Sequence, residues 1–401
     1  MKQLRLLVLA GYAVVGLALA ACAFVPFAKI PFDVELAPAV ELTTGHDPNR
    51  VISADFNADG HLDLVSVHRG DSQLLVFYVA GDGTFAAPET LQLKPHPHGA
   101  IVLDFNGDGV ADLLVLQDES VELAVLLGGA GGLTHAGDVA LGHEDDHGQG
   151  HDHPTGMALG DLNGDGWLDV VLGHENGQLD VFYGDADGHF EAAEPILFGL
   201  GNNLVAALDV QGDGYDDVIV LGDMLSVAEP GEIDGSELLL FEGGPDGLMA
   251  TPRTVSQVRS GRSAMLLVED VDQNGLPDPV MGYAGNGMLS VLPNLGEGRF
   301  DTQQNYLVKS ATSAAFDDFN QDGRLDLVIS QGNGRFALGE VRLFLGAGNL
   351  RFREPEAFSV QLAPVSLTSG DFNGDGFPDL AVANFFSDTL SLILNASAST
   401  P

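Results

Sequence analysis

The sequence DLNGDGWLD, residues 161–169, decides the fold of this chain. Acidic residues stand at its first, fifth and ninth positions, asparagine at its third and glycine at its sixth. Alternate positions of a tight loop direct their side-chain oxygens inward, and glycine permits the positive φ that turns the chain. A flexible, oxygen-only ligand set suits Ca²⁺, whereas Mg²⁺ requires a stricter octahedron and more water. The stretch therefore predicts a calcium-binding loop.

Six further stretches repeat this pattern at regular spacing. They are DFNADGHLD at Asp55, DFNGDGVAD at Asp104, DVQGDGYDD at Asp209, DVDQNGLPD at Asp270, DFNQDGRLD at Asp318 and DFNGDGFPD at Asp371. The first aspartates of the seven stretches are 49, 57, 48, 61, 48 and 53 residues apart in chain order. A period near fifty residues predicts one supersecondary unit, repeated so that each copy buries its neighbour.

Each repeat contains the same series of short apolar runs. GMALGD leads into the stretch at Asp161 and VVLG follows Asp169, and LDVFYG and the weaker EAAEPILFG come after further turns. Short runs rich in Val, Ile and Leu are typical of buried strands. Four antiparallel strands per repeat, seven times over, predict an all-β fold: a seven-bladed β-propeller of four-stranded antiparallel blades.

The seventh repeat ends without a fourth strand. The missing strand is expected at the other end of the chain, where FDVELAPAVELTTG, residues 32–45, resembles fourth-strand segments such as FREPEAFSVQLAPVS. The N-terminal strand should therefore close the ring, because the alternative leaves an unpaired strand edge.

At these residues the repeats resemble the FG-GAP or VCBS repeat family, which includes the propellers of integrin α subunits. The resemblance covers roughly residues 32–395. It implies that each acidic loop joins the first and second strands of a blade and binds Ca²⁺ through positions 1, 3, 5 and 9, with a backbone carbonyl near position 7. Up to seven structural calcium ions are implied, which would change the formal charge from -42 to -28. The implied ligands are Asp55, Asn57, Asp59, Asp63, Asp104, Asn106, Asp108, Asp112, Asp161, Asn163, Asp165, Asp169, Asp209, Gln211, Asp213, Asp217, Asp270, Asp272, Asn274, Asp278, Asp318, Asn320, Asp322, Asp326, Asp371, Asn373, Asp375 and Asp379.

The N-terminus predicts export and a lipid anchor. MKQLRLLVLAGYAVVGLALAAC has a short basic start, an apolar run and small residues, and its end resembles the bacterial lipobox, in which the cysteine is lipidated. Cys22 is the single cysteine of the chain. We expect a signal peptide over residues 1–21, a tether over 22–31, the propeller over 32–395 and a tail over 396–401. The protein would be a membrane-anchored lipoprotein of the periplasm or cell surface; an uncleaved single-pass anchor is the alternative.

Composition limits the choice of partner. The chain has 401 residues, of which 58 are acidic and 16 basic. This charge argues against nucleic acid and against an anionic lipid surface. Hydrophobic residues make up 45% of the chain, too many for a disordered acidic protein, so a folded core is expected.

Histidines gather on one side of the predicted ring. His46, His68, His96, His98 and His174 should lie on the face opposite the acidic loops, with His61, His135 and His189 beside the loops. An insertion over residues 142–153 adds His143, His147, His151 and His153 to the opposite face. Imidazoles mixed with carboxylates suit Zn²⁺ or Cu²⁺, so this loop, together with His96 and His98, is a candidate transition-metal site. A solvated polar loop is the alternative.

Three classes of function follow. The first is an extracytoplasmic scaffold that binds a protein or carbohydrate, or mediates adhesion, through the histidine-bearing face and the central opening. The second is an enzyme, a polysaccharide lyase or hydrolase, with Arg50, His96, His98 and His174 as candidate groups in that opening; the chain shows no recognisable nucleophile arrangement and no nucleotide loop. The third is a metal-handling protein that uses the His-rich insertion.

Overall fold

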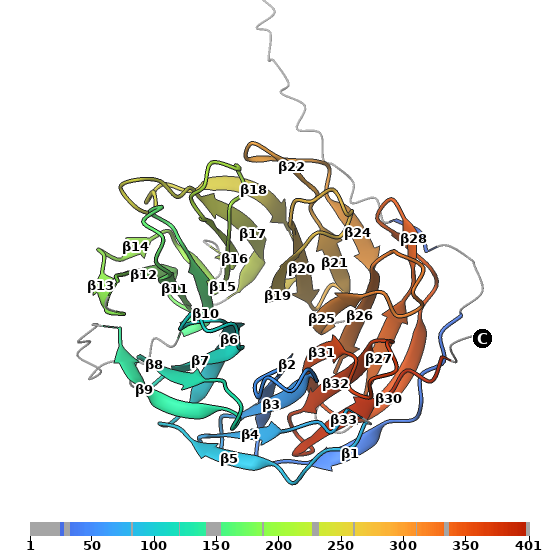
Figure 1. The fold of residues 1–401 in the computed structure, drawn as a ribbon. Coiled ribbons are helices and arrows are strands. Elements are labelled where there is room, and N and C mark those ends of the chain that lie inside the picture. Colours follow the sequence, from blue (N-terminus) through green and yellow to red (C-terminus); the bar gives the residue numbers. More distant parts are fainter. Residues whose placement is uncertain are drawn as a thin grey trace, which may run out of the picture.

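Seven sheets surround a central axis in the computed structural model (Figure 1). The structure describes residues 25–27, 33–81, 83–119, 121–141, 154–186, 188–226, 232–259, 261–309, 311–332 and 337–397. These residues form strands and turns without a helix, which confirms the predicted all-β, seven-bladed propeller. The described residues accordingly include no helix with the length and hydropathy needed to span a bilayer.

The first and second strands of the blades are hydrogen-bonded neighbours. The first strands, which surround the central axis, are β2 (Pro48–Ala54), β6 (Pro97–Leu103), β10 (Pro154–Gly160), β15 (Leu200–Leu208), β19 (Arg262–Glu269), β25 (Ala311–Asp317) and β31 (Pro364–Gly370). The second strands are β3 (Asp63–His68), β7 (Asp112–Gln117), β11 (Asp169–His174), β16 (Asp217–Leu225), β20 (Asp278–Ala284), β26 (Asp326–Gln331) and β32 (Asp379–Asn384).

The third and fourth strands complete each blade toward the outside. The third strands are β4 (Gln73–Phe77), β8 (Glu122–Leu127), β12 (Gln178–Gly184), β17 (Ile233–Phe241), β21 (Met288–Val291), β27 (Leu338–Phe344) and β33 (Thr389–Ile393). The fourth strands are β5 (Glu89–Gln92), β9 (Thr134–Ala140), the pair β13 (Phe190–Ala192) and β14 (Ile196–Leu197), β18 (Arg253–Val258), β24 (Gln304–Leu307), β30 (Glu356–Leu362) and β1 (Val40–Thr43). Two small hairpins are β22 (Asn294–Gly296) with β23 (Arg299–Phe300), and β28 (Gly346–Gly348) with β29 (Arg351–Phe352).

The core lies between blades. Alternate side chains of a strand point to opposite faces of its sheet, so each second strand supplies apolar groups to both neighbouring blades. In β3, Val65 and Val67 pack against blade two, while Leu64 packs against blade seven. Seven such clusters join all neighbouring pairs of blades, which explains why the second-strand sequences are continuously apolar.

The N-terminal strand closes the ring as the sequence predicts. β1 pairs antiparallel with β33, with Val40 opposite Leu392 and Thr43 opposite Thr389. Just before β1, Val34 and Leu36 are buried in the cluster between blades six and seven. Closure therefore rests on strand pairing and on apolar burial together.

Part of the segment assigned to a tether also packs against the ring. The Val25 N–H donates to the Asn305 carbonyl at 2.8 Å, and the Phe27 ring lies 5.2 Å from that of Phe344 and 6.5 Å from that of Tyr306. Residues 25–27 thus contact blades five and six. The signal peptide, Cys22 and the insertion with His143, His147, His151 and His153 lie outside the described residues.

Candidate metal centres

The seven acidic stretches form loops between the first and second strands of their blades, as expected. All seven therefore emerge on one face of the ring, here called the acidic-loop face. The connections between second and third strands and between blades emerge on the other, the opposite face.

Position 1 of each loop is held by backbone amides. In blade three, the N–H groups of Asp165 and Gly166 donate to Asp161 at 3.1 and 2.9 Å. The glycine at position 6 has a φ between 82° and 90° in all seven loops, the left-handed conformation that its sequence position predicts. The same two bonds to position 1 recur in every blade. The loops thus share one backbone conformation.

Position 9 is the first residue of the second strand, and its aspartate is fully buried in all seven blades. In blade three, Asp169 accepts the Leu162 N–H on Oδ2 and the Gly184 N–H on Oδ1, both at 2.9 Å. Equivalent pairs of bonds, between 2.6 and 3.2 Å, tie the loop to the end of the third strand in the other blades. This structural duty, which sequence reasoning missed, leaves lone pairs on both oxygens for a further ligand.

Burial raises the pKa of several of these aspartates. Desolvation raises the pKa of Asp63, Asp169 and Asp278 to about 6, and that of Asp326 and Asp379 to about 7. Neighbouring loop carboxylates raise these pKa values further, while the backbone N–H bonds lower them. The charged form of these aspartates is therefore disfavoured unless a cation compensates it.

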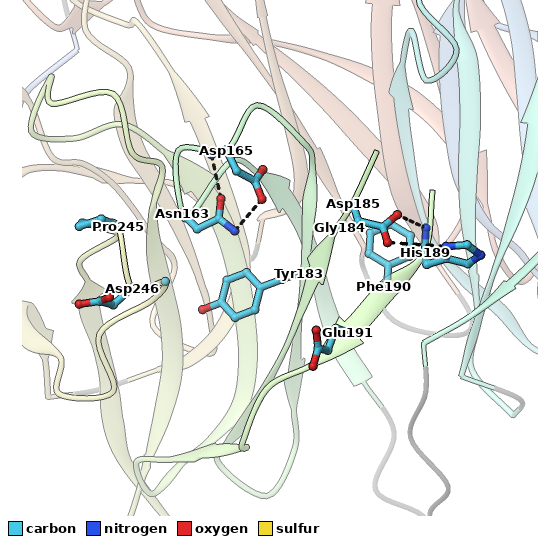
Figure 2. Close-up of a pocket in the computed structure, with 11 residues that line it drawn as sticks. Asn163, Asp165, Tyr183, Gly184, Asp185, His189, Phe190, Glu191, Pro245 and Asp246 are labelled. Carbon is cyan, nitrogen blue, oxygen red and sulfur yellow. Dashed lines mark hydrogen bonds and ion pairs between the residues drawn. The ribbon is translucent and has the colours of Figure 1, made fainter. Parts of the chain in front are cut away.

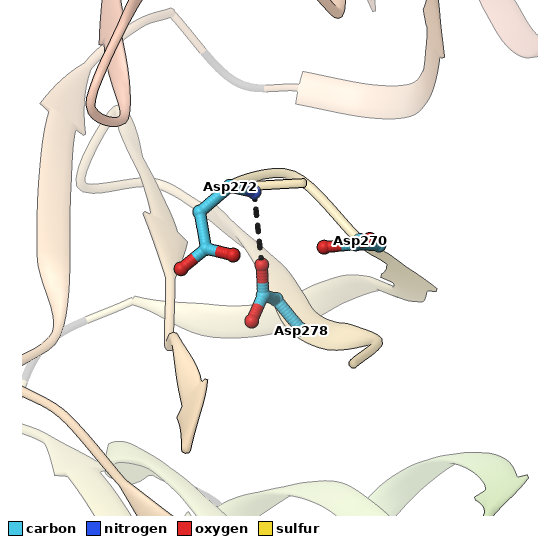
Figure 3. Close-up of side chains that lie close together, drawn as sticks. All are labelled: Asp270, Asp272 and Asp278. Atoms are coloured by element: carbon cyan, nitrogen blue, oxygen red, sulfur yellow. Dashed lines mark hydrogen bonds between the residues drawn. The ribbon is translucent and has the colours of Figure 1, made fainter. Parts of the chain in front are cut away.

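Blade five brings carboxylates closest together. Oxygens of Asp270, Asp272 and Asp278 all lie within 4.8 Å of one another (Figure 3). Aspartate at position 3 produces this cluster, and the amide of Asn274 at position 5 turns away to donate to the Asn294 carbonyl at 3.0 Å. Among the described residues, no other group of three histidine, aspartate or glutamate ligand atoms is as compact.

In most other loops the asparagine at position 3 contacts the aspartate at position 5. In blade three, Asn163 donates from Nδ2 to Asp165 at 3.0 Å, and its Oδ1 accepts the Asp165 N–H at 2.9 Å. Gln211 of blade four, the longer residue at this position, instead reaches Asp217 at 3.4 Å. The sequence departures in blades four and five therefore correspond to real differences in side-chain contacts.

Blade six differs because arginines contact its loop. Arg324 Nη1 lies 2.9 Å and Arg353 Nη2 lies 3.7 Å from Asp322 Oδ2. Arg353 also pairs with Asp33 at 2.7 Å, which connects the loop to the N-terminal segment. In the described part of the chain, no ion pair joins an arginine or lysine to the other six loops. Arg324, inside the loop, was a readable signal for this difference, whereas Arg353 is remote in the chain.

Position 2 anchors the loops in the core. Its apolar side chain is fully or almost fully buried between blades in six of the seven loops, and the residues are Phe56, Leu162, Val210, Val271, Phe319 and Phe372. The alternation of apolar and acidic residues at the start of each stretch was a readable signal for this second role.

A pocket of about 520 Å³ lies beside the blade-three loop (Figure 2). Its charged lining residues are Asp165, Asp185, His189, Glu191 and Asp246. The Tyr183 hydroxyl accepts the Leu248 N–H at 2.8 Å and joins blades three and four along the pocket. Its four carboxylates suit a cation or a neutral, hydroxyl-rich ligand and disfavour a polyanion.

Among the described histidines of the opposite face, His68 Nδ1 lies 3.4 Å from the His46 carbonyl, and no ring-to-ring hydrogen bond joins two of them. His46 pairs with Asp388 at 3.0 Å, and His174 pairs with Asp180 at 3.0 Å while it is buried. His68 is fully buried, and His96 is exposed. Of the candidate groups for the central opening, Arg50 and His98 line one cavity there.

The fold and its loops define a propeller with an acidic loop in every blade. The family model of the FG-GAP-like repeat matches residues 55–115, 104–172, 161–220, 270–329 and 318–382. Each match begins at the first aspartate of a loop. The chain belongs to the FG-GAP-like repeat family.

Solved structures share the fold at low sequence identity. BBS1N, in a complex with ARL6DN that was soaked with lead, is 15% identical with a TM-score of 0.58, over 91% of this chain and 99% of that one. An Agrocybe aegerita lectin, described as recognising non-reducing terminal N-acetylglucosamine, is 18% identical with a TM-score of 0.50, over 84% of this chain and 86% of that one.

Proposed function

We propose that this chain is a calcium-stabilised extracytoplasmic propeller that binds a protein or carbohydrate partner. The observation that carries the calcium proposal is the sevenfold repetition of one acidic loop with a buried aspartate at its base. A single acidic turn would be weak evidence for a metal site. Seven loops with the same backbone hydrogen bonds indicate one shared requirement.

The residues fit calcium by their chemistry. Every loop offers oxygen donors alone, and the converging carboxylates of blade five lack a basic partner among the described residues. Positions 1, 3, 5 and 9 would hold the ion. Bound calcium would supply positive charge that offsets carboxylate repulsion and fixes each loop against its blade.

Exposed apolar side chains support the opposite face as the partner-binding surface. Leu197, Leu225, Leu307, Leu338 and Phe386 are between 39% and 74% exposed on the opposite side of blades three to seven. Exposed large apolar side chains favour a binding role, and they also occur on the acidic-loop face, at Trp167, Leu168, Met249 and Leu295. The two structural neighbours, of which one is in complex with a protein and one recognises a carbohydrate, are consistent with either partner.

The N-terminal sequence supports the location. The apolar run that ends at Cys22 would direct export, and lipidation of Cys22 would attach the propeller to a membrane. Calcium is plentiful outside the cytoplasm, so weak sites with dissociation constants of order 10⁻⁴ to 10⁻³ M would suffice.

Elemental analysis of the purified chain tests the calcium proposal. In equilibrium dialysis against 10 mM calcium, with the content of the protein-free compartment subtracted, we expect close to seven calcium ions per chain, and a chelator should lower the melting temperature. A triple variant, Asp270→Asn, Asp272→Asn and Asp278→Asn, should lose about one ion. No retained calcium and an unchanged melting temperature would refute the proposal. The same measurement detects zinc or copper at the His-rich insertion.

A glycan array tests the proposal that the partner is a carbohydrate. The opposite-face variant combines two substitutions, Leu338→Ser and Phe386→Ser. Met249→Ser, an exposed substitution near the acidic-loop face, is the matched control. Signal lost only in the opposite-face variant would support carbohydrate binding there. Signal lost only in the control would move the site to the acidic-loop face, and no signal from the wild type would leave a protein as the proposed partner.

A further inference from the structure

The central opening contains a cavity of about 160 Å³ between the first strands of blades one to five. β2, β6, β10, β15 and β19 all contribute to its wall (Figure 1). The lining residues are Arg50, His98, Gly99, Ala100, Ile101, Thr155, Gly156, Met157, Leu204, Val205 and Leu266.

This wall differs from the rest of the protein in its charge. The chain carries 58 acidic residues, yet no aspartate or glutamate is among the described residues that line the cavity. Arg50, His98 and Thr155 are its polar side chains, and the remainder are apolar residues or glycine. An apolar wall strengthens electrostatic attraction between a charge and its ligand.

Arg50 is a cation without a carboxylate partner among the described residues. Water reaches its side chain through the opening, but the surrounding first strands desolvate the guanidinium, and this burial lowers its pKa. Some other arginines are neutralised, since Arg69 pairs with Asp118 at 3.4 Å and Arg353 with Asp33 at 2.7 Å.

No other first strand has a charged residue at the repeat position of Arg50. Arg50 stands five residues before the first aspartate of its loop, and the residues at this position in blades two to seven are Gly99, Gly156, Leu204, Met265, Ser313 and Ser366. This charged group is not required by the repeat and is not neutralised by a carboxylate of the described chain, and it is accessible from the opening to an anionic ligand.

We infer that the central cavity binds a small carboxylate. The Arg50 guanidinium would form paired hydrogen bonds to the carboxylate group, as its planar fork favours, and the apolar wall would contact a short hydrocarbon body. The cavity is smaller than pockets for drug-sized ligands, which favours an anion of a few carbon atoms. This inference rests on the proposed binding function and names a ligand for the central opening.

Isothermal titration calorimetry of the calcium-loaded chain with sodium butanoate tests the inference that the central cavity binds a small carboxylate. Sodium chloride is added to hold the ionic strength constant. Butanamide, which has the same carbon chain without the charge, is the control ligand. We expect saturable binding of butanoate alone. Arg50→Gln should weaken this binding at least about tenfold, since a hydrogen bond to a charged group is lost. Arg50→Lys keeps the charge but loses the fork, and should weaken it less.

Arg259→Gln, which removes an exposed arginine outside the cavity, should bind butanoate as the wild type does. Equal affinity of the wild type and Arg50→Gln, or no binding by the wild type, would overturn the inference. Calcium content measured on the same samples separates the two proposals. Seven retained ions without butanoate binding would refute the cavity alone, and butanoate binding without calcium would refute the calcium proposal alone.

Discussion

At the scale of single residues, the aspartate at position 9 combines a predicted role as a metal ligand with a structural role that the sequence did not indicate. A carboxylate in an acidic loop reads as a metal ligand, and the structure adds its bonds to two backbone amides in every blade. Asp169 is fully buried and accepts the Leu162 and Gly184 N–H groups. The residue therefore contributes to folding whether or not a metal is bound.

Asp169→Ala should lower the free energy of unfolding by about 2 to 6 kcal/mol, because two buried N–H groups lose their acceptor at about 1 to 3 kcal/mol each. Asp169→Asn keeps one acceptor oxygen and should cost roughly half as much. Urea unfolding in the presence of a chelator measures both variants without a calcium contribution. If all three proteins were equally stable there, Asp169 would act through the metal alone.

Arg324 should weaken calcium binding in blade six, because it lies 2.9 Å from Asp322 and neutralises that carboxylate. Arg324→Gln should therefore raise the calcium affinity of one site about two- to fivefold, which corresponds to an exposed ion pair of up to about 1 kcal/mol. Calcium titration with a competing chromophoric chelator measures the change. Arg299→Gln is the matched control, since Arg299 pairs with Glu297 outside the acidic loops. An identical effect of both substitutions would point to overall charge instead.

His68 should make the fold sensitive to acid. Its side chain is fully buried, and desolvation lowers its pKa below 6.5, although the His46 carbonyl and the Asp71 and Asp388 carboxylates oppose this shift. The unfolded chain then binds a proton more readily than the folded one, so stability is lost as pH falls below about 6.5.

The chain offers a natural replacement, because Gln117 and Gln331 occupy the equivalent buried positions of β7 and β26. Wild type should lose stability relative to His68→Gln between pH 7 and pH 5, by up to about 1.4 kcal/mol per pH unit. Thermal melts of both proteins across this range measure the difference. A difference that does not vary with pH would show that His68 stays neutral or is solvated.

At the scale of elements, the strong periodicity of the sequence made the blades predictable. Features that depend on short turns or on contacts between distant segments could not be predicted from it. The loops, the second strands and closure by β1 follow from patterns that repeat seven times. The division of the outer strand of blade three into β13 and β14, and the hairpin of β22 and β23, depend on short turns with few apolar residues. The contacts of Phe27 and Arg353 join segments far apart in sequence, which no local pattern records.

Closure by β1 supplies a test at this scale. A chain that begins at residue 45 lacks β1 and the buried Val34 and Leu36, and leaves β33 with an exposed edge. We expect aggregation during size-exclusion chromatography and a melting temperature lower on the order of 10 °C, since each lost apolar side chain costs about 2 to 5 kcal/mol. A chain that begins at residue 28 loses only the described contacts of residues 25–27 with the ring and should stay monodisperse. Equal behaviour of both truncations would mean that β1 is dispensable.

At the scale of the whole molecule, the dominant property is charge. The chain has a formal charge of -42, and its acidic loops emerge together on one face of the ring. The blades are held by apolar clusters between them, so repulsion among loops acts directly against the packing of neighbouring blades. Bound calcium would reduce this repulsion where it is greatest.

Stability should therefore depend on calcium and salt together. Calcium at 1 mM against a dissociation constant of about 10⁻⁴ M would stabilise each loop by about 1.4 kcal/mol, so seven loops predict a fall in melting temperature on the order of 10 °C on chelation. Without calcium, raising sodium chloride from 0.02 to 0.5 M should restore part of the loss, because the screening length falls well below about 10 Å. With saturating calcium, the same salt change should have a much smaller effect, since the loop charges are already paired. Calorimetric melts at the four combinations measure this interaction, with sodium chloride replaced by an uncharged osmolyte as the control for hydration. A salt effect of equal size in both calcium states would mean that the repulsion arises elsewhere on the ring. Calcium in the loops would then not be what neutralises it.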